Sequence, residues 1–147
     1  MAFMNKKVLI LGAGVSGIAV AHVLQEKGAH VILSDAKAEH LFKDADFDSI
    51  RAGGIVLALG RQDEKLLEGI DYVVVSRGIS IYIPLIKAAQ DKAITVMSEV
   101  EVAYRLCPVP IVAITGTNGK TTTTTLIGDM LKTMNHDVVV GGNIGLA

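Results

Sequence analysis

The sequence predicts an α/β fold built on a doubly wound parallel sheet. Short runs of aliphatic and β-branched residues alternate along the chain with segments that have helical periodicity. A cluster of glycines follows the first apolar run, and an aspartate ends the second. Strands that alternate with short helices in this way pack as a parallel sheet with right-handed crossovers.

The composition is that of a folded protein with an aliphatic core. Of the 147 residues, 50% are hydrophobic and only 4% aromatic. The net charge of −1 gives no electrostatic reason to expect nucleic acid or a membrane surface as a partner. The single cysteine, Cys107, excludes an intrachain disulfide and fits a reducing compartment, so we expect a cytoplasmic protein.

The N-terminus could pass for a signal peptide, because Lys6 and Lys7 precede an apolar stretch. Glycines at positions 12, 14 and 17 interrupt that stretch, which is also too short for a membrane span. We therefore expect a mature protein without a membrane-spanning segment.

The first strand is expected at residues 7–11, followed by a glycine loop at 12–17 and a helix that ends near Gly28. The next strand, 30–34, is closed by Asp35, which lies 23 residues after the first glycine. This G-x-G-x-x-G arrangement is typical of a Rossmann-like fold, in which the loop meets a phosphate and the acid lies near a ribose. The alternative is a phosphate-free turn whose third glycine serves only close packing.

The rest of the first part continues the same alternation. We expect a polar connection or short helix at 44–53, strands at 54–57, 71–76 and 94–97, and helices at 63–69, 84–92 and 99–106. The sequence Ser76-Arg77-Gly78 ends one of these strands, at the edge where parallel sheets bind ligands. Pro108 and Pro110 then interrupt the pattern, which predicts one domain at 1–107 and another at 108–147.

The second part predicts a phosphate-binding loop between a strand at 111–114 and a helix at 123–134. Two glycines free backbone N–H groups to point inward, and the helix N-terminus favours an anion. Lys120 would reach the β- and γ-phosphates of a nucleotide, and the hydroxyl of Thr121 would be free to ligate Mg²⁺. The usual P-loop has a glycine where Ile114 stands, so this loop is a tighter variant. The predicted ATP-binding residues are Gly116, Thr117, Asn118, Gly119, Lys120, Thr121 and Thr122.

A further strand is expected at 137–140, which completes the first βαβ unit of a P-loop ATPase domain. A single βαβ unit cannot cover both faces of a parallel sheet, so we infer a fragment of a longer enzyme. The strands at 111–114 and 137–140 should expose apolar edges. Our hypothesis is that residues 108–147 are either mobile or paired with another copy.

Two glycine loops that open separate βα units resemble the N-terminal part of the Mur ligases, which build the peptidoglycan stem peptide. The resemblance covers the whole chain and rests on residues 8–17, 34–36, 76–79, 111–122 and 141–145. Asn118 favours the D-glutamate-adding branch, because the alanine-adding relatives typically carry His there.

The resemblance implies that the first domain binds the UDP part of UDP-N-acetylmuramoyl-L-alanine. Its implied substrate-binding residues are Val15 and Ser16 at the diphosphate, Asp35, Ala36 and Lys37 at the uracil, Gly78 at the base, and Asn143 at the muramoyl region. The implied reaction uses ATP and Mg²⁺ to form an acyl phosphate, which the amine of D-glutamate attacks. Lys120 and Thr121 are the implied catalytic residues. We expect no ligase activity from the 147 residues alone, and a monomeric full-length protein.

One position departs from the family pattern, because Arg77 stands where the family usually has Pro. Without the fixed φ of proline the loop could loosen. Alternatively, Arg77 could pair with a phosphate, or it could be a solvated surface side chain.

Two other classes of protein remain open from the residues. A dinucleotide-binding oxidoreductase or sensor that uses NAD would explain residues 12–35 but leave 116–122 without a role. A nucleoside-triphosphate-driven switch would explain the second loop but not the first. Tight NAD binding without a response to UDP ligands would favour the oxidoreductase.

Overall fold

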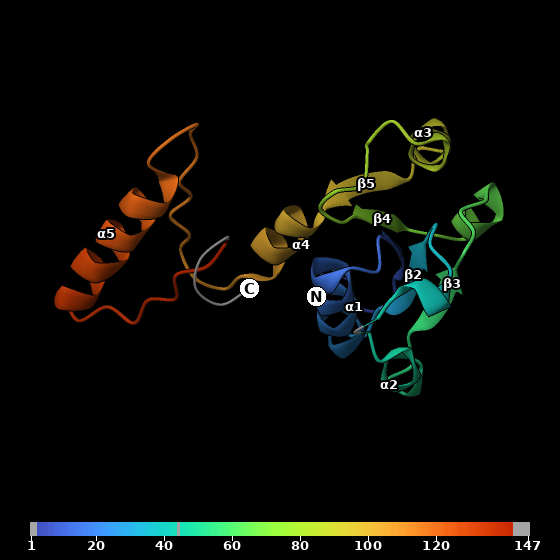
Figure 1. The fold of residues 1–147 in the computed structure, drawn as a ribbon, viewed down its shortest axis with the longest axis horizontal. Helices are drawn as coiled ribbons and strands as arrows, with labels where there is room; N and C mark the ends of the chain where they lie inside the picture. Colours follow the sequence, from blue (N-terminus) through green and yellow to red (C-terminus); the bar gives the residue numbers. More distant parts are fainter. Residues whose placement is uncertain (1–2, 44, 143–147) are drawn as a thin grey trace. The chain divides into compact units, whose positions relative to one another are not determined.

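The computed structural model describes residues 3–43 and 45–142. It divides into two units, Met1–Cys107 and Pro108–Ala147, at the residue before the first of the two prolines. The first unit is an α/β domain around a five-stranded sheet in the order β3-β2-β1-β4-β5, in which every neighbouring pair is parallel (Figure 1). The predicted Rossmann-like fold class is therefore confirmed.

The strands are short and the helices follow them in alternation. The strands are β1 (Lys7–Leu11), β2 (His30–Asp35), β3 (Val56–Leu59), β4 (Tyr72–Val75) and β5 (Thr95–Ser98). The helices of the first unit are α1 (Val15–Glu26), α2 (Phe47–Ala52), α3 (Pro84–Asp91) and α4 (Glu99–Leu106), with 3₁₀ turns η1 (Glu39–Leu41) and η2 (Glu64–Leu67). The second unit contains α5 (Lys120–Thr133).

Both faces of the sheet carry a buried aliphatic layer. On one face, Val8, Ile10 and Leu33 belong to a cluster with residues of α1, α2 and α4. On the other face, Leu9, Leu11, Val73 and Val75 pack with residues of η2 and α3. The sheet is therefore doubly wound, and its successive side chains alternate between the two layers.

One strand begins later than expected because a glycine ends the preceding helix. The strand expected at 54–57 is β3, two residues later, because Gly54 has φ +87° and donates its N–H to the carbonyl of Arg51 at the end of α2. The short helix expected within 44–53 is α2, capped by the Asp46 side chain, which accepts from the Ser49 N–H.

The second unit differs more from the prediction. α5 begins at Lys120, not at residue 123, because Gly119 in the left-handed conformation is its N-cap. The strands predicted at 111–114 and 137–140 are wrong: no strand forms there within the described residues 108–142. A strand requires a hydrogen-bonded neighbour, and neither segment has one in this described part. The segment around Val140 instead packs on α5, where a Cβ on Gly128 would lie 2.6 Å from Val140 Cγ2.

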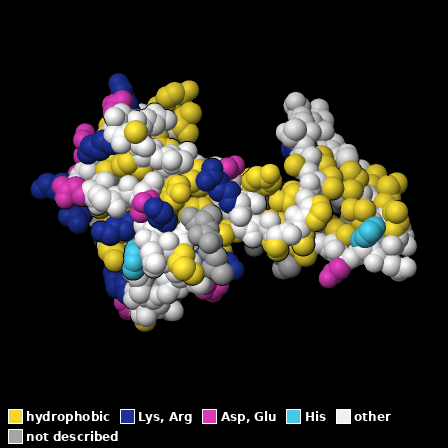
Figure 2. All heavy atoms as spheres, turned by 180° about the vertical axis from the view of Figure 1, so that it is seen from behind, with side chains coloured by type: hydrophobic (Ala, Val, Ile, Leu, Met, Phe, Trp, Pro, Cys, Tyr) yellow, Lys and Arg dark blue, Asp and Glu magenta, His cyan; other side chains and the backbone are white. Residues whose placement is uncertain are grey.

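Many hydrophobic side chains of the second unit lie at its surface (Figure 2). The exposed ones include Val109, Ile111, Val112, Leu126, Met130, Met134 and Val139. None of the helices in the described residues is long and apolar enough to cross a membrane.

Candidate functional site

The carboxyl ends of β1, β2 and β4 lie side by side at one edge of the sheet of the first unit. The chain order reverses between β1 and β4, which is the topological switch point where open α/β sheets bind ligands. Six of the seven substrate-binding residues predicted from the resemblance lie at the ends of these strands, in the loops that follow them or in the first turn of α1: Val15, Ser16, Asp35, Ala36, Lys37 and Gly78. The seventh, Asn143, lies outside the described residues.

The glycine loop after β1 brings the chain from the strand into α1 with close backbone contacts. Gly12 has φ +103°, and its N–H donates to the Ser34 carbonyl at 2.7 Å. A Cβ on Gly17 would lie 1.8 Å from the Gly12 carbonyl oxygen, so only glycine fits there. Within this described segment α1 has neither a side-chain cap nor an acidic residue in its first turn, and Val15 is 80% exposed. The N–H groups of the first turn are thus available to an anion.

Asp35 connects the end of β2 to the glycine loop. Its Oδ2 accepts the Ala13 N–H at 2.8 Å and its Oδ1 accepts the Lys37 N–H at 2.9 Å. The carboxylate is half-buried, whereas Ala36 and Lys37 are exposed beside it. Each oxygen retains a further lone pair, so Asp35 can order both loops and still accept from a ligand.

Residues 76–79 form a tight turn at the end of β4. The Ile79 N–H donates to the Ser76 carbonyl at 3.2 Å, and Gly78 has φ +89° whereas Arg77 is not among the residues with positive φ. These values define a type II turn with Arg77 in the second position and Gly78 in the third. A Cβ on Gly12 would meet Ser76 and Ile79 at 3.1 Å, so this turn lies against the glycine loop.

A hollow of about 340 Å³ lies at this edge, between the ends of β4 and β5. Its polar lining residues are Ser76, Arg77, Ser98 and Glu99, and Ile79, Val96 and Met97 are among its apolar ones. The Arg77 N–H donates to Glu99 Oε1 at 3.0 Å.

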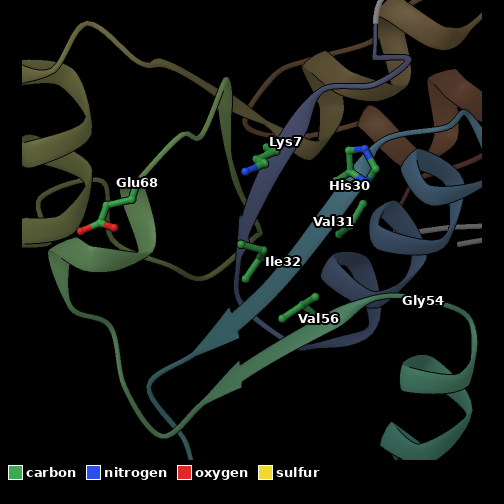
Figure 3. Close-up of a pocket in the computed structure, with 7 residues that line it drawn as sticks. All are labelled: Lys7, His30, Val31, Ile32, Gly54, Val56 and Glu68. Carbon is green, nitrogen blue, oxygen red and sulfur yellow. The ribbon is translucent and has the colours of Figure 1, made fainter.

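A second hollow lies at the other end of the strands. Its lining residues include Lys7 and His30, the first residues of β1 and β2, together with Ile32, Val56 and Glu68 (Figure 3). None of the predicted site residues lines this hollow. Nearby, the Lys7 N–H, followed by the Lys6 ammonium, lowers the pKa of Asp71 below its ordinary value. These contacts anchor the sheet at the edge opposite the candidate site.

The glycine–lysine loop of the second unit precedes α5. Gly116 has φ +148° and Gly119 has φ +75°. The Lys120 ammonium donates to the carbonyls of Gly116 and Thr117, so it folds over its own loop. All seven predicted ATP-binding residues, 116–122, are exposed in this segment.

The threonines of α5 fall into two groups. The hydroxyls of Thr124 and Thr125 donate to the carbonyls of Lys120 and Thr121, one turn earlier. Among the described residues, the hydroxyls of Thr121 and Thr122 have no such partner. These two hydroxyls are therefore available to a ligand at the helix N-terminus.

The residues present fit a nucleotide-bound Mg²⁺ better than a protein-held one. The described residues contain no group of three or more His, Cys, Asp or Glu side chains that could hold a metal. Mg²⁺ at nucleotide sites commonly takes one or two protein ligands, with phosphate oxygens and water completing its shell. The Thr121 hydroxyl fits that limited role.

Two hydrogen bonds at the site were not anticipated from the sequence: the Ala13 N–H donates to Asp35, and the Arg77 N–H donates to Glu99. The pattern Ser98-x-x-Glu101 does indicate the start of α4, and the Ser98 side chain accepts the Glu101 N–H. The pattern gives no indication that the intervening Glu99 turns toward another loop.

The fold and the two glycine loops are typical of nucleotide-binding α/β proteins. Residues 6–98 match the family model described as Mur ligase MurD-like, N-terminal domain. The chain belongs to this Mur ligase family.

Curated relatives agree with the match. The chain is 46% identical, over 97% of its length, to a protein of Pelotomaculum thermopropionicum named UDP-N-acetylmuramoylalanine--D-glutamate ligase. It is 45% identical, over 99% of its length, to the protein of the same name from Caldanaerobacter subterraneus subsp. tengcongensis. The chain spans about a third of the length of these relatives, 31% and 32%.

Solved structures are also similar. A pseudomurein peptide ligase type C from Methanothermus fervidus matches 95% of this chain with a TM-score of 0.58 and 28% identity, and the match covers 29% of that protein. A murein peptide ligase from Psychrobacter arcticus matches 89% of this chain, over 27% of its own length, with a TM-score of 0.62 and 23% identity. The latter likeness shows the fold alone.

Proposed function

We propose that this chain is the part of an ATP-dependent ligase that holds UDP-N-acetylmuramoyl-L-alanine and begins the ATP site, in an enzyme that adds D-glutamate to that substrate in peptidoglycan synthesis in the cytoplasm. The observation that carries the proposal is that one chain contains two sites suited to bind a phosphate: the uncapped N-terminus of α1 and the loop at 116–122 before α5. Relatives that are 45–46% identical and named as this ligase support the same reaction.

The first unit holds the UDP moiety in this proposal. The N–H groups at Val15 and Ser16 meet the diphosphate, because a helix N-terminus with no acid in its first turn favours an anion. Asp35, Ala36 and Lys37 flank the uracil, and Gly78 contacts the base through its backbone. Open space around a Cβ built on Gly78 supports a ligand approach at that residue.

The second unit holds ATP through residues 116–122. Lys120 exchanges its contacts with the carbonyls of Gly116 and Thr117 for the β- and γ-phosphates, and Thr121 offers one oxygen to Mg²⁺. ATP supplies the phosphoryl group that activates the substrate carboxylate, and cationic groups offset the charge on the transferring oxygens. Asn143 at the muramoyl group, the site for D-glutamate and the monomeric state of the whole enzyme belong to the proposal as well.

The domain assignment also belongs to the proposal. Residues 1–107 are the substrate-binding domain, and residues 108–147 belong to the ATP-binding domain. The division of the structure after Cys107 supports this boundary.

Calorimetric titration of the chain with UDP-N-acetylmuramoyl-L-alanine, UDP and NAD tests the first unit. The proposal expects both UDP ligands to bind and NAD to give no heat of binding. Binding of NAD alone would return the glycine loop to the oxidoreductase alternative. A Val15→Asp variant places a carboxylate in the first turn of α1 and should weaken UDP binding at least about tenfold by repulsion of the diphosphate.

Lys120→Ala tests the second unit, with Lys132→Ala in the last turn of the same helix as the matched control. The first variant should abolish Mg²⁺–ATP binding measured with a fluorescent ATP analogue, while UDP binding stays unchanged. The control variant should leave both unchanged. Equal losses in the two variants would show that net charge, not the position of Lys120, governs the interaction.

A further inference from the structure

The turn at residues 76–79 is held from outside by a carboxylate that neither the family match nor the sequence pattern assigns to the site. In a type II turn, the bond between the first and fourth residues closes the loop and leaves the N–H of the second residue unused. Here that N–H belongs to Arg77, and it donates to Glu99 Oε1 at 3.0 Å. Glu99 lies 22 residues further along the chain, so this bond is a tertiary constraint on the turn.

Glu99 is well placed for this role by its position in α4. It is the first residue of the helix, where the helix dipole favours a negative charge. The Ser98 side chain already caps the helix by accepting the Glu101 N–H, so Glu99 is not needed as a cap. Its half-buried carboxylate is directed instead to the end of β4, the neighbouring strand of β5.

The neighbouring carboxylate in the same turn of α4 has a different use. Glu101 Oε1 accepts from Arg105 Nε at 2.8 Å, an ion pair within the helix. The chain thus offers two half-buried glutamates on one helical turn, of which one holds the loop and the other does not.

We propose that Glu99 is a positioning residue for substrate binding: its carboxylate fixes the Ser76–Ile79 turn and thereby the place of Gly78 against the nucleotide part of the substrate. This inference rests on the proposed function for the location of the UDP moiety. Arg77, Gly78 and Glu99 all line the hollow of about 340 Å³ at this edge. Loss of the bond would free the turn to move without disturbing the buried strand β4.

The test compares Glu99→Ala, Glu99→Gln and Glu101→Ala in the full chain, with UDP as the probe in calorimetry. Glu99→Ala should weaken UDP binding about tenfold, the size expected for loss of one hydrogen bond to a charged group. Glu99→Gln keeps an oxygen acceptor and should restore binding to within about threefold of the original chain. Glu101→Ala should leave the dissociation constant unchanged, although it removes the same charge from the same helical turn.

Arg77→Pro provides an independent check, because proline removes the N–H and fixes φ near the value that the second position of the turn requires. In the Arg77→Pro chain, the further change Glu99→Ala should not weaken UDP binding, since no bond remains to be lost. A tenfold loss in both backgrounds would overturn the positioning role and indicate that Glu99 acts on the ligand by another route.

Amide hydrogen exchange tests the hydrogen bond between Arg77 and Glu99 independently of its effect on UDP binding. Glu99→Ala should accelerate exchange of the Arg77 amide, while the amides of β4 and the melting temperature match those of Glu101→Ala. Unchanged exchange at Arg77, or equal UDP binding by the original chain and Glu99→Ala, would contradict the inference. Failure of the original chain to bind UDP would overturn the proposed function itself, and with it the role of the turn in binding.

Discussion

The two units of this chain use similar apolar sequences with different results. In the first unit, each short aliphatic run is a strand with a hydrogen-bonded neighbour, and the central residues Leu9 and Ile10 are fully buried. In the second, the run at 111–114 has the same character, yet Ile111 is 51% and Val112 62% exposed and no strand forms among residues 108–142. A hydrophobic run therefore becomes a strand only where a partner strand and a covering helix are present.

The two candidate sites also differ in how their loops are held in place. The loops of the first unit donate hydrogen bonds to carboxylates on other elements: the Ala13 N–H to Asp35 and the Arg77 N–H to Glu99. The loop at 116–122 is held by contacts within itself, from Lys120 to the carbonyls of Gly116 and Thr117. The first site is thus preorganised by its fold, whereas the second depends on local geometry.

The largest expected difference between the units is in amide hydrogen exchange. Amides of β1 and β4 exchange only through global unfolding, so they should be slowed at least about a thousandfold. Amides at 111–114 and 137–140 have no strand partner within the described residues and should exchange near the rate of an unstructured chain. Nuclear magnetic resonance in a dilute sample measures both. Equal protection in the two units would contradict the contrast and indicate pairing with a second copy.

Gly17→Ala should have the largest effect on stability. The new Cβ would lie 1.8 Å from the backbone oxygen of Gly12, which cannot move without displacing the end of β1. We expect a loss of about 3 kcal/mol in the free energy of unfolding, the upper part of the range for overpacking. Urea unfolding followed by circular dichroism gives the value.

Gly14→Ala is the matched control, because a Cβ there meets nothing within 4 Å and the backbone has negative φ. Its cost should stay below about 1 kcal/mol. Similar costs at Gly14 and Gly17 would show that close packing is not what the glycine loop requires.

The sequence predicted most of the first unit and little of the second. The G-x-G-x-x-G spacing and the aspartate at the end of β2 predict the first βαβ unit of the parallel sheet. The shift of β3 was not predictable, since it depends on the positive φ of Gly54 after α2. The hydrogen bond from Arg77 to Glu99 was not predictable either, because it joins a turn to a helix 22 residues further along the chain, and only the sheet brings them together.

Asp71→Asn, at the sheet edge opposite the candidate site, should lower the stability of the fold by a smaller amount that depends on pH. The Lys7 N–H and the Lys6 ammonium hold the pKa of Asp71 below its ordinary value of 3.8. Because the pKa of Asp71 is lower in the folded state, the ionised carboxylate stabilises the fold at pH values above its unfolded-state pKa. This stabilisation is lost as the pH falls through the folded-state pKa. Thermal unfolding should therefore distinguish the variant from the original chain near pH 7, and the difference should shrink as the pH falls below 3.8. A difference in melting temperature that grows as the pH falls would contradict a lowered pKa of Asp71.

Gly128→Ala in the second unit should change stability least among these variants. The new Cβ meets Val140 Cγ2 at 2.6 Å, which is a side-chain methyl and not a backbone atom. The clash can be relieved by a small movement of Val140, and alanine is about 1 kcal/mol better than glycine in a helix. We expect a net change within about 0.5 kcal/mol, measured from the helical signal of α5 on heating. A loss as large as that of Gly17→Ala would show that the second unit is as tightly packed as the first.

The central claim is that the first unit holds the UDP part of the substrate at the carboxyl edge of its sheet. Titration of an isotopically labelled chain with UDP, followed by backbone amide resonances, tests it most directly. The account predicts shifts at Val15, Ser16, residues 35–37 and Gly78, and none at residues 116–122. Shifts confined to 116–122, or to the hollow at Lys7 and His30, would contradict it.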